Sequence, residues 1–285
     1  MSEAEPISLR DEITAALASA GANPRHALGQ NFMVDRSALN ALLDNIAAKP
    51  GLRVVEVGPG TGVLTRRMLA AGATVLAVEF DSVLADLLER DLGETALQLV
   101  RGDALASKTA LNPAIEAFAA QGPWVLGANL PYDIAIPLIL NCLCLPNPPE
   151  RCVVTVQWEC AKRLCSASGS RDWGASAAVC QTAASGRIVR KLPPRCFYPR
   201  PRVDSAVLAL AVHGSVPAGF SNWCRGVFAY RRKQLTRALR DHGLTRDAAH
   251  AAVARAGLAL ERRIEELSVA ELQALFGATQ ESDDV

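Results

Sequence analysis

The chain has 285 residues, of which 50% are hydrophobic and 21% are charged, so it can bury a sizeable core. This composition excludes bulk disorder, and the polar, acidic N-terminus excludes a signal peptide. No apolar run reaches the roughly 18 residues of a membrane span. The eight cysteines and four histidines lack metal-ligand spacing. We therefore expect a soluble, cytoplasmic protein that has no metal site.

Two short helices are predicted first, over residues 8–20 and 35–48, with a loop rich in Gly, Asn and Pro between them. From residue 53 onward, predicted strands alternate with helices. The strands are expected over residues 53–57, 74–78, 97–101, 124–128, 152–157 and 207–212. Such alternation implies crossover connections and therefore an α/β fold with a mostly parallel, buried sheet.

Beyond residue 213 the apolar periodicity is helical only. Helices are predicted over residues 222–228, 233–241, 246–256 and 269–276, followed by a disordered tail from about Gly277. We therefore expect two domains. Residues 1–213 form an α/β domain with an N-terminal helical segment, and residues 214–285 form a small helical domain.

A glycine-rich turn, Gly58-Pro59-Gly60-Thr61-Gly62, follows the first predicted strand. Glycines let the backbone approach a ligand closely, and ligands of doubly wound sheets lie beyond the carboxyl ends of the strands. Glu79 stands at the end of the next strand, where an acid can accept hydrogen bonds from both hydroxyls of a ribose. NAD and S-adenosylmethionine both carry this ribose, so Gly58 and Glu79 do not distinguish the two cofactors.

Two further acids lie near strand ends. Asp81 precedes a predicted helix and suits an N-cap. Asp103 follows the third strand, where its carboxylate can accept a hydrogen bond from the amino group of the cofactor's adenine. For Asp103 alone, a turn or a helix cap is the simpler interpretation.

The segment Asn129-Leu130-Pro131-Tyr132 follows the fourth strand and indicates the chemistry. The exocyclic amine of adenine is a poor nucleophile because its lone pair is delocalised into the ring. An asparagine oxygen and a backbone carbonyl can accept hydrogen bonds from this amine and so favour a localised lone pair. Pro131 stiffens the turn, and Tyr132 offers a flat face for a flipped-out base. Asn129, Pro131 and Tyr132 are the predicted catalytic residues.

Basic residues concentrate between Gly186 and Arg240, where twelve Lys or Arg residues accompany a single acid, Asp204. Such a local excess can attract a polyanion although the whole chain has a net charge of only +1. The pattern by itself favours a solvated surface.

In this order, the motifs resemble those of the small-subunit (16S) ribosomal RNA adenine dimethyltransferase family. The resemblance extends from about Arg25 to Arg240. It includes three more segments, LGQNFM at 28–33, FYPRPRVDSAV at 197–207 and FAYRRKQL at 228–235.

The resemblance implies a Rossmann-like class I methyltransferase sheet of seven strands, one of them antiparallel, and a helical C-terminal domain that binds RNA or the ribosome. It implies S-adenosylmethionine as cofactor. The residues carried over for the cofactor are Asn31, Met33, Gly58, Glu79, Asp103 and Asn129. The residues expected to bind the RNA substrate, from the family motifs and the basic segment, are Tyr132, Phe197, Arg200, Arg202, Arg231, Arg232 and Lys233.

The implied reaction places two methyl groups on each of two adjacent adenosines in the hairpin near the 3′ end of small-subunit ribosomal RNA. Phe197 would stack on the target adenine opposite Tyr132. The implied partner is the small ribosomal subunit, and the family suggests a monomer. The sequence departs from the family pattern at His26, Met33, Asp133 and Trp158. Asp133 would add negative charge near the RNA site.

Three alternatives remain. The first is a large-subunit adenine methyltransferase of the macrolide-resistance type, against which Leu130 and the segment 197–207 argue. The second is a ribosome-assembly factor with weak or lost catalysis, against which Glu79, Asp103 and Asn129 argue. The third is a nicotinamide-dependent dehydrogenase, which the GxGxG spacing disfavours.

Overall fold

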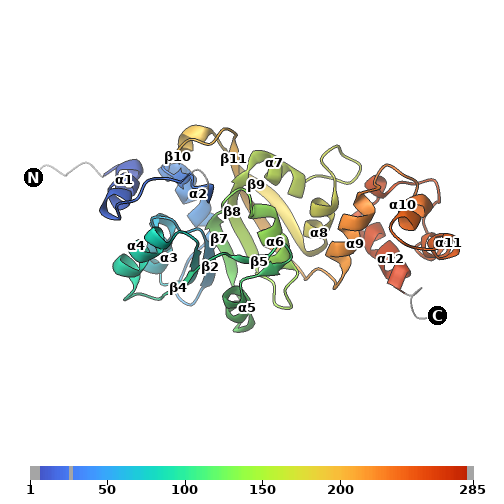
Figure 1. Cartoon of the computed structure of the whole chain (residues 1–285), viewed down its shortest axis with the longest axis horizontal. Coiled ribbons are helices and arrows are strands. Elements are labelled where there is room, and N and C mark those ends of the chain that lie inside the picture. Colours follow the sequence, from blue (N-terminus) through green and yellow to red (C-terminus); the bar gives the residue numbers. More distant parts are fainter. Residues whose placement is uncertain (1–6, 26–27, 281–285) are drawn as a thin grey trace, which may run out of the picture. The chain divides into compact units, whose positions relative to one another are not determined.

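A computed structural model describes residues 7–25 and 28–280 (Figure 1). The chain divides into two compact units, Met1–Ala161 with Gly186–Val212 and Lys162–Ser185 with His213–Val285. His26, one of the departures from the family pattern, lies outside the described residues.

The first unit is built on a seven-stranded sheet with the order β4-β3-β2-β7-β8-β11-β9. The strands are β2 (Arg53–Val57), β3 (Thr74–Glu79), β4 (Leu97–Arg101), β7 (Val125–Asn129), β8 (Arg151–Gln157), β9 (Ala184–Leu192) and β11 (Ser205–Val212). Adjacent strands from β4 to β8 are parallel, whereas β11 is antiparallel to β8. The predicted methyltransferase-type sheet is therefore confirmed, and β9 is the strand that the sequence reading missed.

Four helices connect the parallel strands: α3 (Val63–Ala70), α4 (Ser82–Leu92), α5 (Pro113–Ala120) and α6 (Ala135–Leu143). The helices α1 (Leu9–Ser19) and α2 (Arg36–Ile46) precede the sheet, and α7 (Trp158–Leu164) follows β8. Side-chain caps define several of their starts: Asp35 accepts from the Ala38 N–H, and Asp81 accepts from the Val83 N–H. The N-cap expected of Asp81 is thus confirmed.

One core cluster packs helices α1 to α4 against a face of the sheet, with Ile13, Leu42, Val54 and Val153 among its buried members. A short antiparallel pair, β1 (Phe32–Met33) with β10 (Phe197–Tyr198), joins this cluster. A second small pair is β5 (Leu105–Ser107) with β6 (Ala110–Leu111). The β1–β10 pair therefore ties the loop before α2 to the segment that leads into β11.

The second unit is helical. Its elements are α8 (Ala175–Ala183), α9 (Phe220–Phe228), α10 (Leu235–Asp241), α11 (Arg246–Arg255), the 3₁₀ turn η3 (Ile264–Glu266) and α12 (Val269–Gln280). Phe220, Trp223 and Phe276 pack with ring centroids 5.4–5.9 Å apart. The disorder expected from Gly277 is wrong for residues 277–280, because α12 continues there and buries Ala278 and Thr279. The unit also includes α8, which lies before the domain boundary predicted from sequence.

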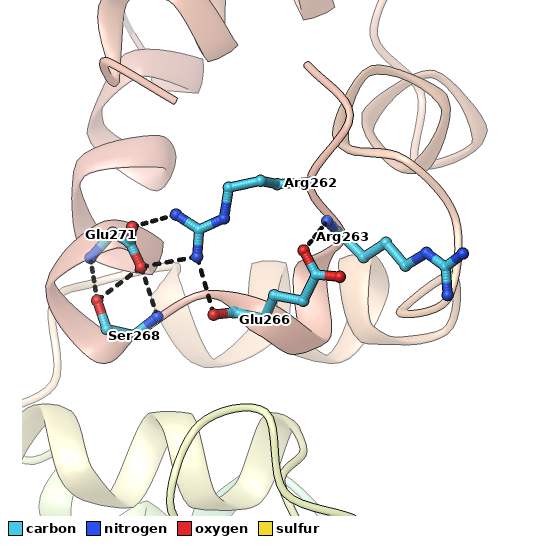
Figure 2. A network of polar contacts seen from close by, with 5 residues as sticks. All are labelled: Arg262, Arg263, Glu266, Ser268 and Glu271. Carbon is cyan, nitrogen blue, oxygen red and sulfur yellow. Dashed lines mark hydrogen bonds and ion pairs between the residues drawn. The ribbon is translucent and has the colours of Figure 1, made fainter. Parts of the chain in front are cut away.

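The start of α12 carries a polar network (Figure 2). Ser268 and Glu271 cap each other, since each backbone N–H donates to the other's side chain, at 2.8 and 3.3 Å. Arg262 bonds both carboxylate oxygens of Glu271 and the Glu266 carbonyl oxygen. Hydrogen bonding to Arg262 lowers the pKa of Glu271 to about 2. The network fixes the first turn of the last helix.

No helix within residues 7–25 and 28–280 is both long enough and apolar enough to cross a membrane.

Candidate active site

A cavity of about 260 Å³ opens at the carboxyl ends of strands β2, β3 and β7. Its lining includes all six residues predicted to hold the cofactor, Asn31, Met33, Gly58, Glu79, Asp103 and Asn129. Pro131 and Tyr132 line the same cavity. Residues from segments about 100 positions apart therefore meet at one edge of the sheet, as expected for parallel strands.

The glycine-rich turn after β2 needs glycine for steric reasons. Gly58 and Gly60 have φ angles of +67° and +61°. A Cβ on Gly58 would lie 3.2 Å from Cγ of Pro131, and one on Gly60 would lie 2.8 Å from Cε1 of Phe32. The glycines thus allow the turn to approach the Asn129–Tyr132 segment and the β1 segment that share the cavity.

Glu79 is held in place by the backbone. Its side chain, in a residue only 5% exposed, accepts the Gly60 N–H at 3.0 Å on Oε2 and the Asp81 N–H at 2.8 Å on Oε1. Burial raises the pKa of Glu79, and these two hydrogen bonds oppose the shift. An ionised carboxylate has about four acceptor sites, so each oxygen can still accept a hydrogen bond from a ligand.

A second carboxyl group lines the cavity, and the sequence reading did not single it out. Glu56 is 2% exposed and accepts the Thr65 hydroxyl at 2.7 Å. Burial raises its pKa to about 8, with a smaller contribution from the charge of Glu79. The signal was present in the sequence, because a lone acid interrupts the apolar strand Arg53–Val57.

Asp103 and Phe80 also line the cavity. Asp103 is exposed and accepts the Leu105 N–H at 2.9 Å on Oδ1, which leaves Oδ2 for other donors. Phe80 is 63% exposed, an unusual position for a large aromatic side chain, and it also lines the cavity. The sequence reading missed Phe80, although it stands directly between Glu79 and Asp81.

The side-chain amide of Asn129 is hydrogen-bonded through its nitrogen. Its Nδ2 donates to the Asn31 carbonyl oxygen at 2.9 Å, and Nδ2 of Asn31 donates to the Gly29 carbonyl oxygen at 2.9 Å. The oxygen Oδ1 of Asn129 accepts no hydrogen bond within residues 7–25 and 28–280. Asn129 therefore offers an acceptor at the cavity, and this orientation follows from its bond to the β1 segment.

Tyr132 is also anchored. Its hydroxyl lies 2.6 Å from Oγ of Ser205, the first residue of β11. Burial raises the pKa of Tyr132, so the phenol stays neutral at physiological pH. Asp133, which replaces the usual Asn of the family pattern, is exposed and lines the cavity as well.

The other predicted RNA-binding residues lie elsewhere. Phe197 is 2% exposed, belongs to the core cluster and is not part of the cavity lining. Its stacking role stays a prediction. Arg200 and Arg202 are exposed in the loop before β11, which agrees with a role at the surface but does not test it.

In the second unit, the three predicted basic residues differ from one another. Arg231 donates to the Trp173 carbonyl oxygen at 3.1 Å and lies 3.5 Å from the Glu265 carboxylate. Lys233 forms an ion pair of 2.6 Å with Asp241. Arg232 is exposed and has no partner in the described part of the chain. Arg232 is therefore the one of the three whose charge is not already used by the fold.

The residues at the cavity fit S-adenosylmethionine. Gly58 and Gly60 line the cavity without side chains, Glu79 keeps acceptor sites for ribose hydroxyls, and Asp103 keeps one for an adenine amine. The exposed ring of Phe80 adds an apolar face at the same edge. No cluster of three or more His, Cys, Asp or Glu side chains that could hold a metal occurs in the ranges described.

Fold and site together define a class I methyltransferase. Two solved structures share the fold: a dimethyladenosine transferase from Plasmodium falciparum (TM-score 0.71, 19% identity, 88% of this chain and 98% of that one) and the 23S rRNA methyltransferase ErmE (TM-score 0.62, 23% identity, 88% and 100%). The model of the family described as ribosomal RNA adenine dimethylase matches residues 21–281. The chain belongs to this family.

Curated relatives carry the name ribosomal RNA small subunit methyltransferase A. The relative from Desulfitobacterium hafniense is 33% identical over 278 residues, covering 95% of this chain and 98% of the relative. Those from Deinococcus radiodurans (34%; 97% and 92%) and Pelotomaculum thermopropionicum (36%; 90% and 91%) are similar over comparable lengths. The predictions of the family, of an rRNA adenine dimethyltransferase and of S-adenosylmethionine as its cofactor are confirmed.

Proposed function

We propose that this chain methylates N6 of two adjacent adenosines in the hairpin near the 3′ end of small-subunit ribosomal RNA, with two methyl groups on each. The observation that carries the proposal is the arrangement of Asn129, whose Nδ2 is bound to the Asn31 carbonyl and whose Oδ1 remains available at the cavity. Curated relatives with nearly equal chain length, named as small-subunit methyltransferases, support the choice of subunit.

Asn129 acts on the nucleophile. The bound cofactor supplies an electrophilic methyl group. Oδ1 of Asn129 and a nearby backbone carbonyl accept hydrogen bonds from the adenine amine, which favours a localised lone pair on N6. After transfer the N6 proton is acidic and leaves to solvent, so the site needs no strong base.

Tyr132 and the basic residues hold the substrate. The Tyr132 ring at the cavity provides a stacking surface for a base that has left its helix. The exposed Arg200, Arg202 and Arg232 contact phosphates and so position the RNA without reading its sequence. The partner is the small ribosomal subunit, which the chain engages as a monomer.

The test is methyl transfer from labelled S-adenosylmethionine to purified small subunits that lack the modification, with large subunits in parallel. We expect label in small subunits only, recovered as N6,N6-dimethyladenosine. Asn129→Ala is expected to lower kcat about 100- to 1,000-fold, the range for loss of one group that stabilises the transition state.

Three outcomes contradict the proposal in different ways. Label confined to large subunits indicates the macrolide-resistance type of activity. Tight binding to small subunits with no methyl transfer indicates an assembly factor. In that case Asp133, a departure from the family pattern at the cavity, is the first residue to substitute. Full activity of Asn129→Ala removes the role assigned to that amide.

A further inference from the structure

The hydrogen bond between Tyr132 and Ser205 joins a residue of the cavity to a residue outside it. Tyr132 lines the cavity, whereas Ser205 is 0% exposed and does not line it. The two hydroxyl oxygens are 2.6 Å apart, a short distance for a neutral O–H···O bond. Because Ser205 does not line the cavity, the effect of its hydroxyl on a ligand is expected to pass through the phenol that it bonds.

The tyrosine is fixed at both ends. On the backbone side, the ring of the preceding Pro131 packs so closely on Gly58 that a Cβ there would lie 3.2 Å from it. At the far end, Ser205 holds the hydroxyl, and Ser205 is itself fixed because β11 pairs with β8 from its first residue, opposite Gln157. These two anchors hold the axis of the side chain from Cβ to the hydroxyl. A phenol forms its hydrogen bonds close to the plane of its ring because the oxygen is conjugated with the ring, so a partner held by the sheet also favours one orientation of that plane.

We infer that Ser205 is a positioning residue for methyl transfer, which holds the Tyr132 ring in the plane on which the target adenine stacks. This inference rests on the proposed function. A stacked base takes its orientation from the ring beneath it, and methyl transfer requires the amine to lie in line with the methyl group. Loss of the Ser205 hydroxyl leaves the stacking surface in place but frees its orientation.

The test is a double-mutant cycle with Ser205→Ala, Tyr132→Phe and the double variant, assayed for methyl transfer to small subunits. A neutral hydrogen bond contributes about 0.5–1.5 kcal/mol, so each single variant is expected to lose about 3- to 10-fold in kcat. The double variant is expected to lose no more than either single one, because both remove the same bond. The affinity for S-adenosylmethionine, measured by calorimetry, stays within about twofold of the wild type because Ser205 does not reach the cofactor side.

The chain offers a matched control in Thr155. This residue lies on β8, is 0% exposed, and its hydroxyl has no hydrogen-bond partner in the described structure. Thr155→Val removes a buried hydroxyl from the strand next to β11 while keeping the side-chain shape, and it is expected to retain wild-type kcat. Ser205→Thr keeps a hydroxyl at the position and is expected to recover most of the activity that Ser205→Ala loses.

The possible results separate the two hypotheses. If the wild type does not methylate small subunits, the proposed function fails, whatever the variants do. If the wild type is active and Ser205→Ala has wild-type kcat, the positioning role is overturned. It is equally overturned if the losses of Ser205→Ala and Tyr132→Phe multiply in the double variant, or if Thr155→Val loses as much as Ser205→Ala.

Discussion

Two buried carboxyl groups at the cavity of the first unit and one carboxyl group of the second unit have opposite environments. At the cavity of the first unit, Glu56 and Glu79 are buried and have no cationic partner among the residues described, and burial raises the pKa of each. At the start of α12 in the second unit, Glu271 is paired with Arg262 and capped by Ser268, and its pKa falls to about 2. Ionisation of the buried glutamates lowers the free energy of unfolding, whereas ionisation of Glu271 raises it.

This difference separates groups that serve the fold from groups that are available to a ligand. Glu271 has its acceptor sites filled by protein donors, whereas Glu79 is held by two backbone N–H groups and keeps sites free. The same distinction applies to the cations, because Arg231 is paired with Glu265 and Arg232 is not paired in the described structure. A destabilising group retained at a cavity is a mark of a functional site.

The largest effect that follows from these environments is expected in cofactor binding, at Glu79. Glu79→Gln replaces a carboxylate that accepts two backbone N–H groups by an amide whose NH₂ must face one of them. We expect the affinity for S-adenosylmethionine to fall about 100-fold or more, because charge-assisted bonds are lost and a donor meets a donor. Calorimetric titration of the purified chain measures this affinity.

The control for this experiment is Glu94→Gln, which changes an exposed acid just after α4 and is expected to bind the cofactor as the wild type does. Equal affinities of the Glu79 and Glu94 variants would show that the carboxylate of Glu79 is not a cofactor ligand.

The next largest effect is a pH dependence of stability that originates at Glu56. Its folded pKa, about 8, lies above the ordinary value of 4.5. The folded state therefore keeps a proton that the unfolded chain releases. The associated stability is complete below about pH 4.5 and is lost as the pH rises through 8.

Glu56→Gln keeps an acceptor for the Thr65 hydroxyl and cannot ionise. Ionisation of the wild type then gives the variant an advantage on the order of 4 kcal/mol at pH 8, which falls to under about 1 kcal/mol near pH 5. Urea unfolding at both pH values measures this. Glu271→Gln is the opposite control: the lowered pKa of Glu271 means that its stabilising contribution is present above pH 4.5 and is lost as the pH falls toward 2. A stability gain of Glu56→Gln that is the same at pH 5 and pH 8 would exclude ionisation of Glu56 as the cause.

The parts of the site that follow strands could be predicted from the sequence. The strands Arg53–Val57 and Leu97–Arg101 were predicted with the bounds that the structure has. Because parallel strands end at one edge, a residue directly after a strand is placed by the sheet itself. This is why Gly58, Glu79 and Asn129 meet as expected.

The parts that depend on distant pairing could not be predicted in the same way. Strand β9 is exposed along much of its length and carries Arg187, Arg190 and Lys191, so it lacks the apolar run that marked the buried strands. Phe197 is drawn into the core because β10 pairs with β1 across more than 160 positions. The roles of Glu56 and Ser205 at the site depend on their burial and on their hydrogen-bond partners, which only the fold defines.

The smallest effect is expected at the basic residues of the second unit, and it tests the distinction between paired and unpaired cations directly. Arg232→Ala removes an exposed charge without a protein partner, so it is expected to weaken small-subunit binding about threefold and to reduce the salt slope of binding by about one. Its thermal stability should equal that of the wild type.

Arg231→Ala breaks the bond to the Trp173 carbonyl and the ion pair with Glu265, so we expect a lower Tm. The two variants are compared by filter binding to small subunits across a series of salt concentrations and by thermal unfolding. The opposite result is that Arg231→Ala changes the salt slope of binding with no loss of Tm, while Arg232→Ala leaves that slope unchanged. This result would show that ion pairing within the protein does not determine which cation binds the RNA. In that case the ion pair of Arg231 opens when the phosphate arrives, because a phosphate competes for the same guanidinium as the Glu265 carboxylate does.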